Sequence, residues 1–482
     1  MRAWFDYDSQ SNERTRRRNR HSYVGRAWRA LSPPQLFAGS FLTLILLGTV
    51  GFKTLPGLYA GSALSWLDAL FTAASAICVT GLIVVDTATY FTFWGQAYIL
   101  FLIQIGGLGM ITFTTIIIST LGRRLSVRHE TLAEGPAEIV PDIGYRDLAW
   151  AATRFTFITE AVGAVLLYLC WVPRFGWEGA PWPSVFHAIS AFCNAGFSTF
   201  TASLMPFREN LPLLCVVMAL IVVGGLGFLT LEEVYRWGQA GRAGRERRFR
   251  LSVHSQIVLV TTAVLIVGGW GLFTVFEWGN TLAGLPLVER LANGLFASVT
   301  PRTAGFNTID YGEALPSTNF LTMLFMSVGG SPGSMAGGIK TTTAALLVLM
   351  AWARLRGRMH VNVSSRTLPR DTINRAMSVF VVAFGIVTAG IYGMTLVDFE
   401  SVFASATESG FLEHMFEAVS ALNTVGLSMG ATGNLTAGGK VITIVLMYVG
   451  RVGPLSLAAA VSRSRKRGSA DVRLAREDVA VG

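Results

Sequence analysis

Four glycines recur in the chain, each at the end of the same local pattern. The patterns read FTAASAICVTG (71–81), FHAISAFCNAG (186–196), LFASVTPRTAG (295–305) and FEAVSALNTVG (416–426), and successive glycines are 115, 109 and 121 residues apart. Glycine adopts positive φ without a steric penalty, which lets successive backbone carbonyls point the same way. Carbonyls arranged like this replace the water shell of a cation. The spacing therefore predicts a backbone site for a dehydrated cation.

Three residues of each pattern supply the candidate carbonyls of this filter. They are Val79, Thr80 and Gly81; Asn194, Ala195 and Gly196; Thr303, Ala304 and Gly305; and Thr424, Val425 and Gly426. Six residues before the glycine stand Ser75, Ser190 and Ser420, with Val299 as the exception. For one glycine, close packing of two helices would be the better explanation, but four glycines in register favour the ion site.

The patterns differ three residues before the glycine, where Cys78, Cys193, Arg302 and Asn423 stand. An arginine beside a cation path would repel the ion. We therefore expect Arg302 to point away from the path and to brace the loop around Pro301.

A second glycine motif follows each pattern at a nearly constant distance. It reads GGLG (106–109), GGLG (224–227), GGSPG (329–333) and GRVGP (450–454), and it begins 25, 28, 24 and 24 residues after the first glycine. Two motifs that keep step four times indicate an internal fourfold repeat.

The third copy lies in SVGGSPGSMAGGIKTTT (327–343), which holds five glycines and a proline. Such a run cannot remain a regular helix, and broken helices at membrane depth mark transport paths. We interpret it as a gating loop below the filter, with a simple kink as the alternative. The gate residues are Gly329, Gly330, Ser331, Gly333, Ser334, Gly337, Gly338 and Lys340, together with Arg451 of the fourth copy.

Arg451 aligns with Gly107, Gly225 and Gly330 of the other copies. A charge inside a membrane is costly and usually faces an interior cavity with a partner. We expect Arg451 either to bond the loop's carbonyls and hold it closed or to form a barrier to cations; a structural ion pair is the alternative. Glu160, also inside an apolar run, is a candidate partner for a basic group.

The composition indicates that a membrane holds these motifs in place. Of 482 residues, 52% are hydrophobic and 14% are charged, and a typical soluble domain has about 25% charged residues. A soluble enzyme, a disordered chain and a disulfide scaffold are therefore poor interpretations.

Eight apolar runs reach the ~20 residues that a spanning helix needs: 36–58, 93–121, 148–171, 211–236, 254–278, 318–353, 375–397 and 438–462. Four shorter runs (64–78, 182–193, 287–300 and 411–422) are expected to dip into the membrane and turn back. The fold class is thus an all-α polytopic membrane protein with four helix–pore half-helix–helix repeats around a central pore. The half-helices would direct their partly negative C-terminal ends toward a cation. This arrangement resembles a potassium-channel pore.

The basic residues set the predicted orientation. Of the 39 Lys and Arg residues, 31 lie in five segments: 1–35, 122–154, 236–250, 354–375 and 463–482. Short loops rich in Lys and Arg stay in the cytoplasm, so both termini are expected there, and no signal peptide is expected. Because each cluster adjoins an apolar span, contact with membrane lipid is favoured and nucleic acid is not.

These boundaries predict nine parts of the chain. They are a basic cytoplasmic N-terminus (1–35), pore repeat 1 (36–121), a cytoplasmic loop (122–147), pore repeat 2 (148–236), a second loop (237–253), pore repeat 3 (254–353), a third loop (354–374), pore repeat 4 (375–462) and a cytoplasmic C-terminus (463–482).

The sequence offers no catalytic constellation. The six histidines lack ligand spacing, and the four cysteines lie in or beside apolar stretches. We expect no enzymatic activity and no bound cofactor. A carrier for an organic solute that binds at the broken helix is an alternative function, as is a membrane-embedded enzyme or a non-transporting scaffold.

The motifs resemble the Ktr/Trk/HKT superfamily of potassium transporters. The resemblance rests on VTGL (79–82), NAGF (194–197), TPRTAGFNT (300–308) and TVGLS (424–428), and on the gating-loop run 329–343 and GRVGP. It spans about 36–462 and is greatest to KtrB-type membrane subunits, since 1–35 leaves no room for an extra helix pair. Gly81, where sodium-conducting members often have serine, favours potassium. Met335 departs from the small residue expected in the loop.

The resemblance implies further properties. It implies potassium at the filter, with sodium as a coupling or activating ion, and a homodimer in the bacterial cell membrane. It also implies a cytosolic KtrA-type regulatory ring that binds ATP or ADP and contacts the basic loops 122–154, 236–250 and 354–375. A sodium/potassium transporter of the same superfamily is the alternative.

Overall fold

The computed structural model of the chain describes residues 33–110, 145–242, 250–364, 366–398 and 409–453. Most of the predicted basic segments 1–35, 122–147 and 463–482 lie outside the described residues, as do 111–121 and 455–462. The chain divides into the unit Phe41–Pro454 and a second unit, Met1–Ser40 with Leu455–Gly482. The candidate site lies in the first unit.

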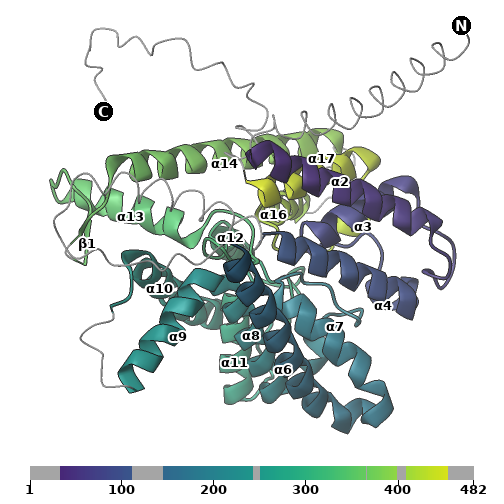
Figure 1. The fold of residues 1–482 in the computed structure, drawn as a ribbon. Coiled ribbons are helices and arrows are strands. Elements are labelled where there is room, and N and C mark those ends of the chain that lie inside the picture. Colours follow the sequence, from purple (N-terminus) through teal and green to yellow (C-terminus); the bar gives the residue numbers. More distant parts are fainter. Residues whose placement is uncertain (1–32, 111–144, 243–249, 365, 399–408, 454–482) are drawn as a thin grey trace, which may run out of the picture. The chain divides into compact units, whose positions relative to one another are not determined.

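The described chain is mostly helical (Figure 1). Its first half contains α2 (Pro33–Thr54), α3 (Trp66–Ile77), α4 (Thr87–Tyr90), an unlabelled helix (Phe93–Met110), α6 (Tyr145–Gly179), α7 (Pro181–Phe192), the 3-10 turn η1 (Met205–Phe207), α8 (Leu211–Leu226) and α9 (Phe228–Arg242). Its second half contains α10 (Val253–Glu277), α11 (Leu287–Val299), α12 (Pro316–Met326), α13 (Thr341–Leu355), α14 (Arg370–Val397), α16 (Ser409–Asn423), the turn η3 (Thr432–Asn434) and α17 (Ala437–Val452). The short antiparallel pair β1 (Asn362–Val363) and β2 (Arg366–Thr367) precedes α14.

Among the described residues, five helices are long and apolar enough to cross a membrane: Pro34–Thr54, Phe93–Met110, Ala149–Gly179, Val253–Glu277 and Arg370–Val397. The pair α8 and α9 makes a sixth if it counts as one broken span. On α10, Val260, Val264 and Val267 share one face and are 62–64% exposed, as suits contact with lipid rather than water. The protein is therefore a mostly helical, multi-pass membrane protein.

The expectation of one continuous helix over 211–236 is wrong. The chain bends by 103° between α8 and α9, at Gly227, whose φ is +83°. Gly453 has φ +86° and ends α17 at the equivalent position of its own motif. The last glycine of the second motif thus stops a helix in two of the four copies, because a left-handed residue cannot continue it. The run 318–353 is interrupted between Met326 and Thr341, as its glycines and proline predict.

The four short apolar runs form the helices α3, α7, α11 and α16, of 12, 12, 13 and 15 residues. At about 1.5 Å per residue they reach roughly 18–22 Å, less than the ~30 Å hydrocarbon core. Their starts are marked by residues suited to a first turn. The Ser65 side chain accepts from the Asp68 N–H, while Pro181 begins α7 and Pro286 precedes α11.

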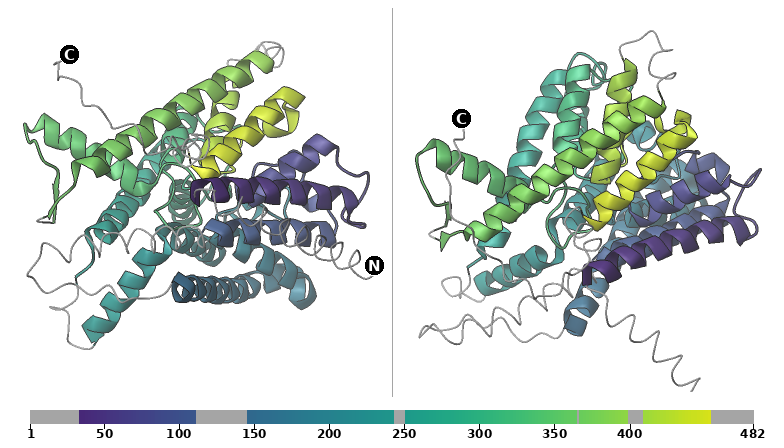
Figure 2. Two further views of the ribbon diagram at one scale, coloured as in Figure 1. Left: turned by 45° about the horizontal axis from the view of Figure 1, so that its top comes forward. Right: turned by 90° about the horizontal axis from the view of Figure 1, so that it is seen from above.

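These four short helices pack in a closed circuit with their neighbours. α11 packs on α8, α16 on α12 and α3 on α17; Figure 2 gives two further views of these helices. α7 meets the helix Phe93–Met110, where Trp182 Nε1 donates to Gln96 Oε1 at 2.7 Å. Lys440 Nζ lies 2.7 Å from Asp68 Oδ1 and joins α17 to α3 across 372 residues of sequence. The last short-helix repeat is thereby joined to the first.

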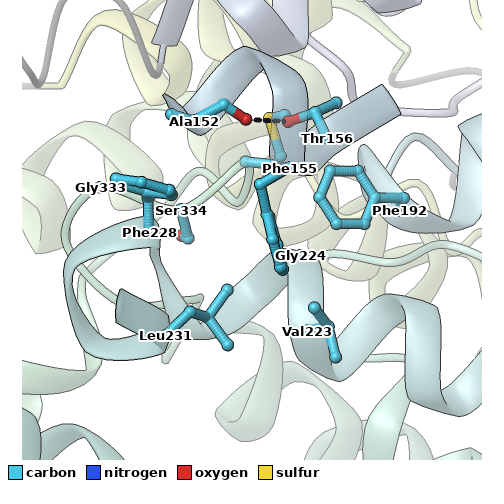
Figure 3. A pocket seen from close by; sticks show the side chains of 11 residues that line it. Ala152, Phe155, Thr156, Phe192, Val223, Gly224, Phe228, Leu231, Gly333 and Ser334 are labelled. Atoms are coloured by element: carbon cyan, nitrogen blue, oxygen red, sulfur yellow. Dashed lines mark hydrogen bonds between the residues drawn. The ribbon is translucent and has the colours of Figure 1, made fainter. Parts of the chain in front are cut away.

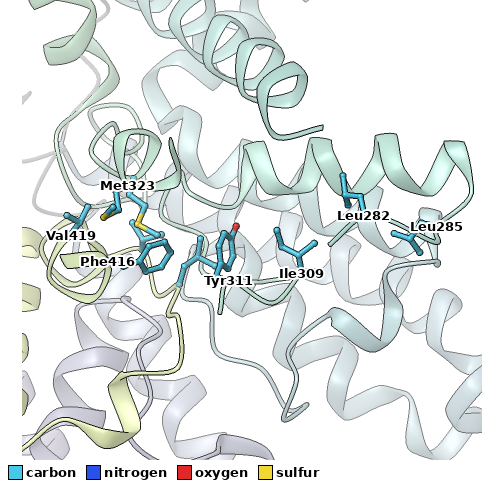
Figure 4. Packing of buried hydrophobic residues seen from close by; sticks show 10 residues of the cluster. Leu282, Leu285, Ile309, Tyr311, Met323, Phe416 and Val419 are labelled. Atoms are coloured by element: carbon cyan, nitrogen blue, oxygen red, sulfur yellow. The ribbon is translucent and has the colours of Figure 1, made fainter. Parts of the chain in front are cut away.

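A hydrophobic cluster supports one side of this circuit (Figure 4). Met323 and Met326 of α12 pack with Phe416 and Val419 of α16. The cluster also contains Val425 and Leu427, on either side of the fourth predicted filter glycine, and it is completed by Leu282, Leu285, Ile309 and Tyr311. The rings of Tyr311 and Phe416 lie 5.6 Å apart. Apolar packing thus fixes the backbone that carries the fourth pattern.

Glu277 connects the end of α10 to the start of α12. Its buried carboxylate accepts from Asn280 Nδ2 at 2.9 Å and from Thr281 Oγ1 at 2.7 Å. It also accepts from the Leu315 N–H at 3.0 Å and from the Thr318 hydroxyl. A buried carboxylate is stable when its lone pairs are used in this way.

We predict that Glu277→Gln lowers the stability of the folded protein by about 2 kcal/mol, because the amide cannot accept all of these bonds and leaves buried donors unpaired. Thermal unfolding of the purified protein in detergent measures the loss. Glu313→Gln is the matched control, since the Glu313 side chain is exposed. Equal melting temperatures for the two variants would contradict the role of Glu277.

Candidate ion filter and gate

The four pattern glycines meet in a closed ring. A Cβ atom added at any of the four glycines would lie very close to a carbonyl oxygen of another segment. The distances would be 2.4 Å from Gly81 to Ala195, 3.0 Å from Gly196 to Ala304, 2.5 Å from Gly305 to Val425 and 2.1 Å from Gly426 to Thr80. Each glycine therefore faces the residue that precedes the next glycine in the ring. Real Cβ atoms essentially never lie under 3.0 Å from such atoms, so only glycine fits the ring without a shift.

Positive φ angles occur at two positions of each ring segment, and only one of these positions is glycine. The four glycines have φ between +71° and +96°. The residues two positions earlier also have positive φ: Val79 at +55°, Asn194 at +58°, Thr303 at +68° and Thr424 at +50°. Positive φ is a genuine outlier for β-branched residues and costs of order 1–3 kcal/mol each. The surrounding packing imposes this conformation.

The recurring serine braces the ring. The Ser75 hydroxyl accepts from the Gly81 N–H, and the Ser420 hydroxyl accepts from the Gly426 N–H, both at 3.1 Å. In the second segment, Ser190 Oγ instead donates to the Phe197 carbonyl at 2.8 Å. The serine spacing in the sequence therefore corresponds to direct support of the filter backbone.

In the third segment, the residue that makes the supporting hydrogen bond lies one position later in the pattern. Val299 occupies the serine position, but Thr300 Oγ1 donates to the carbonyl of Phe306 at 2.5 Å. This is the bond that Ser190 makes to Phe197. Arg302 is buried, and its guanidinium reaches away to Thr262 Oγ1 of α10 at 3.3 Å.

The second glycine motif brings the following helix onto the end of the short helix. A Cβ at Gly106 would lie 2.0 Å from the Ile77 carbonyl oxygen, one at Gly224 2.0 Å from that of Phe192, and one at Gly450 1.7 Å from that of Leu422. Each of these carbonyls belongs to the residue four positions before a ring glycine. The two motifs keep step in the sequence because they touch in the fold, a contact that the sequence spacing alone did not identify.

The run 327–343 folds as a loop against the ring. Gly329 N–H donates to the Ile339 carbonyl at 2.8 Å, and the hydroxyls of Ser331 and Thr341 lie 3.0 Å apart, so the two ends of the loop are pinned together. A Cβ at Gly337 would lie 2.0 Å from Thr424 Oγ1, and one at Gly338 2.9 Å from Asn423 Oδ1. The loop backbone is therefore in contact with the ring-forming segment of the fourth pattern.

The loop is also bonded to the bend between α8 and α9. Ser331 N–H donates to the Gly225 carbonyl at 2.9 Å, and Met335 N–H donates to that of Gly224 at 3.2 Å. In return, the first amide of α9, that of Phe228, donates to the Gly333 carbonyl at 3.2 Å. The start of α9 is thus hydrogen-bonded directly to the loop.

Arg451 is buried and holds the loop from the opposite side. Its guanidinium donates to the Met335 carbonyl at 2.5 Å and to the Gly106 carbonyl at 3.1 Å. Lys340 Nζ donates to the Ala336 carbonyl at 2.6 Å. Within the described residues these cations donate to carbonyl oxygens rather than to carboxylates.

Glu160 does not meet a basic group among the described residues. Its carboxylate accepts from Gln104 Nε2 at 3.1 Å, and Cys193 Sγ lies 3.7 Å from its other oxygen. Cys193 precedes the ring residue Asn194, and a Cβ at Gly107 would lie 3.0 Å from its sulfur and 3.3 Å from Met335 Sδ. The acid is therefore part of the wall between the ring and the loop.

An apolar pocket lies behind the loop (Figure 3). The Phe155 ring stands 6.4 Å from both Phe192 and Phe228. Gly333, Ser334 and Met335 of the loop also line the pocket. One side of the loop thus faces aromatic side chains of α6, α7 and α9.

We predict that Gly224→Ala destabilises the protein, because its methyl group would lie 2.0 Å from the Phe192 carbonyl oxygen and neither backbone can yield without moving the ring. The matched control is Gly385→Ala in α14, where a Cβ meets nothing within 4 Å and alanine is the better helix former by about 1 kcal/mol. The yield of monodisperse protein and its melting temperature check both variants. A Gly224→Ala protein as stable as the control would contradict the close-approach explanation.

The family model described as TrkH, cation transport protein, matches residues 44–469. The chain is 36% identical to the potassium/sodium uptake protein NtpJ of Enterococcus hirae, covering 95% of this chain and 99% of that protein. It is 37% identical to the Ktr system potassium uptake protein B of Bacillus subtilis (91% and 95% covered) and of Vibrio alginolyticus (89% and 91%).

Among solved structures, that of the potassium transporter TrkH from Vibrio parahaemolyticus matches with a TM-score of 0.69. It covers 90% of this chain and 86% of that chain at 18% identity, and it therefore shows a shared fold. The matches in sequence place the chain in the TrkH family of cation transport proteins, as a KtrB-type member of the Ktr/Trk/HKT superfamily.

Proposed function

We propose that the chain is the ion-translocating subunit of a potassium uptake system. The closed ring of four glycines, with the carbonyls of Thr80, Ala195, Ala304 and Val425 against it, is the observation that carries this proposal. A ring of carbonyls replaces the hydration shell of a monovalent cation. The relatives named as potassium uptake proteins support potassium as that ion.

The filter consists of the three ring residues of each segment, with the side chains held out of the path. The short helices α3, α7, α11 and α16 end at the ring, so their partly negative C-terminal ends favour a cation there. Arg302 lies in the same region but reaches toward α10, which keeps its charge off the path.

We further propose that four pore repeats with eight spanning segments enclose this filter. The repeats are 36–121, 148–236, 254–353 and 375–462, joined by cytoplasmic loops 122–147, 237–253 and 354–374. Both basic termini, 1–35 and 463–482, then lie in the cytoplasm of a bacterial cell, as the positive-inside rule requires. The circuit of short helices, each packed on a helix of the preceding repeat, supports this arrangement.

The gate is the loop 329–343 with Arg451. Arg451 joins the loop to the first repeat through two carbonyls. Opening the path requires these bonds to break, together with those to Gly224 and Gly225. Each is a single hydrogen bond. A movement of α9 that destabilises the closed loop by a few kcal/mol is therefore enough to shift the equilibrium between the closed and the open gate.

The partners we propose are membrane lipid, a second copy of the chain in a homodimer, and a cytosolic KtrA-type ring whose ATP or ADP state sets the gate. The names of the relatives, which belong to a Ktr system, support a multi-subunit transporter. The basic loops 122–154, 236–250 and 354–375 are the surface proposed for the ring. The chain itself needs no cofactor.

Sodium enters the proposal as a coupling or activating ion. The relative named as a potassium/sodium uptake protein keeps a sodium/potassium transporter as the second candidate. All four ring positions are glycine in this chain, which favours potassium, since a side chain at any of them would narrow or displace the carbonyl ring.

Uptake of rubidium into proteoliposomes tests the function. The purified chain, reconstituted with its regulatory subunit, is expected to take up Rb⁺ with little inhibition by excess Na⁺. Inhibition by Na⁺ as strong as by K⁺ would favour the second candidate. Uptake of an organic solute without Rb⁺ flux would replace the proposal by a carrier.

We predict that Gly305→Ser reduces the preference for K⁺ over Na⁺ by roughly tenfold, which is about 1.4 kcal/mol of relative binding. The added Cβ would lie 2.5 Å from the Val425 carbonyl oxygen and must displace it. Gly433→Ser is the control, because a Cβ there meets nothing within 4 Å. Competition of Na⁺ and K⁺ against Rb⁺ uptake measures the ratio. An unchanged ratio in Gly305→Ser, and in Gly196→Ser, would refute the filter assignment.

We predict that Arg451→Ala and deletion of 331–338 each raise Rb⁺ flux several-fold, because both remove contacts that hold the loop closed. Arg208→Ala, which removes an exposed arginine elsewhere in the chain, is the control and should leave flux unchanged. Flux equal to that of the unmodified protein in both gate variants would contradict the gate.

A further inference from the structure

Two of the four ring segments are bonded a second time to their short helix, just after the ring glycine. In the second segment, His187 Nε2 of α7 lies 2.9 Å from Ser198 Oγ. In the fourth, a carboxylate oxygen of Glu417 in α16 accepts from the Ser428 hydroxyl. His187 and Glu417 both stand nine residues before the ring glycine, the two serines stand two residues after it, and both helix residues are fully buried.

The first and third repeats have different residues at these two positions. Thr72 and Phe296 stand nine residues before the glycine, and Ile83 and Asn307 stand two residues after it. Thr72 Oγ1 donates to the Asp68 carbonyl, four residues earlier in its own helix, at 2.8 Å. The helix of the third repeat offers only a phenyl ring. The bond across the glycine is therefore a property of the second and fourth repeats.

The bonds of His187 fix which of its ring nitrogens carries the proton. Nδ1 lies 2.8 Å from the Pro183 carbonyl oxygen, which can only accept, so Nδ1 is the donor. Nε2 of the neutral ring then accepts from the Ser198 hydroxyl. Ser198 Oγ itself accepts from the Phe200 N–H at 3.0 Å. A continuous series of hydrogen bonds thus runs from the first turn of α7 to the backbone that leaves the ring.

Aromatic side chains hold the imidazole in place. The Phe200 ring stacks on it with the ring centroids 5.0 Å apart, and Trp171 meets it edge-on, also at 5.0 Å. Phe306, the residue after the third ring glycine, lies 6.0 Å away. Among the ion pairs of the described residues, none includes His187. A buried charge without a partner is costly, so the imidazole is a neutral acceptor.

The segment that His187 holds is bonded to two other repeats. Thr201 Oγ1 donates to Asp86 Oδ2 of the first repeat at 2.7 Å. The Leu204 N–H donates to the Asn307 carbonyl of the third repeat at 3.1 Å. Residues 198–204 therefore connect the segments that leave the ring in the first, second and third repeats.

We propose that His187 is a positioning residue for ion preference, which acts through Ser198 on the backbone of the carbonyl ring. Together with Ser190, which donates to the Phe197 carbonyl, it fixes both residues that follow Gly196. The placement of the carbonyls governs how a filter discriminates between K⁺ and Na⁺. The proposal rests on the proposed function and deepens it, because it assigns part of the preference to a side chain that never touches the ion.

Competition of Na⁺ and K⁺ against Rb⁺ uptake by the full-length chain in proteoliposomes tests this role. His187→Phe places the residue of the third repeat in the second; it keeps an aromatic ring but removes the acceptor. It is expected to lower the preference for K⁺ over Na⁺ about fivefold, the effect of one net hydrogen bond. Ser198→Ala, which removes the donor with little change in volume, is expected to do the same.

His187→Gln is the conservative variant, since its amide oxygen can accept from Ser198 in place of Nε2. It is expected to keep the preference within about twofold of the unmodified protein. Thr72→Val is the matched control, because it removes a hydroxyl at the equivalent place in α3 that bonds only within its own helix. Its preference should equal that of the unmodified protein.

The double variant His187→Phe with Ser198→Ala separates a joint role from two independent ones. A preference equal to that of either single variant supports the proposal, and losses that multiply overturn it. An unchanged preference in Ser198→Ala overturns it even where His187→Phe fails to fold, as does a His187→Gln protein as impaired as His187→Phe. An unmodified protein that takes up no Rb⁺ would instead refute the proposed function.

Discussion

Four pieces of backbone approach one another closely at the ring, and the rest of the described structure accommodates this approach. At the ring, each glycine stands where a Cβ would come within 2.1 to 3.0 Å of a neighbouring segment. Four non-adjacent stretches of chain can come this close only if their side chains are absent or turned away. The short helices deliver the stretches to one place, the serine and threonine hydroxyls fix their amides and carbonyls, and the second glycine motif lets the following helices close in behind them.

The buried cations near the ring are also held by backbone groups. A membrane interior offers no water to an arginine, and a carboxylate partner would create a fixed dipole beside the ion path. Arg451 instead donates to backbone carbonyls from two different parts of the chain. The Met335 carbonyl belongs to the loop, which has left regular helix, so the broken helix and the buried guanidinium stabilise each other.

Sequence reasoning located the ring residues and the short helices to within about two residues at most boundaries, because both depend on local periodicity and glycine spacing. It did not find the positive φ of Val79 or Thr424, since β-branched residues adopt that conformation only when tertiary packing imposes it. Sequence reasoning expected α8 and α9 to be one helix, because the apolar run is continuous. The bend depends on contacts between Gly227 and the loop, since a Cβ at Gly227 would lie 2.6 Å from the Pro332 carbonyl oxygen. Two further features can be found only in the three-dimensional structure. Thr300 takes the role of the serine from one residue later in the pattern, and Glu160 has neutral partners.

The ring is built from one chain, so its four quadrants need not be alike. In an assembly of four identical subunits, every substitution is made four times and the pore changes all at once. Here the quadrants already differ, with Val79, Asn194, Thr303 and Thr424 at equivalent places, and only the third carries the loop. Under the proposed function, substitutions in such a chain change ion preference one quadrant at a time, and the proposed gate is a single loop that needs no concerted change among subunits.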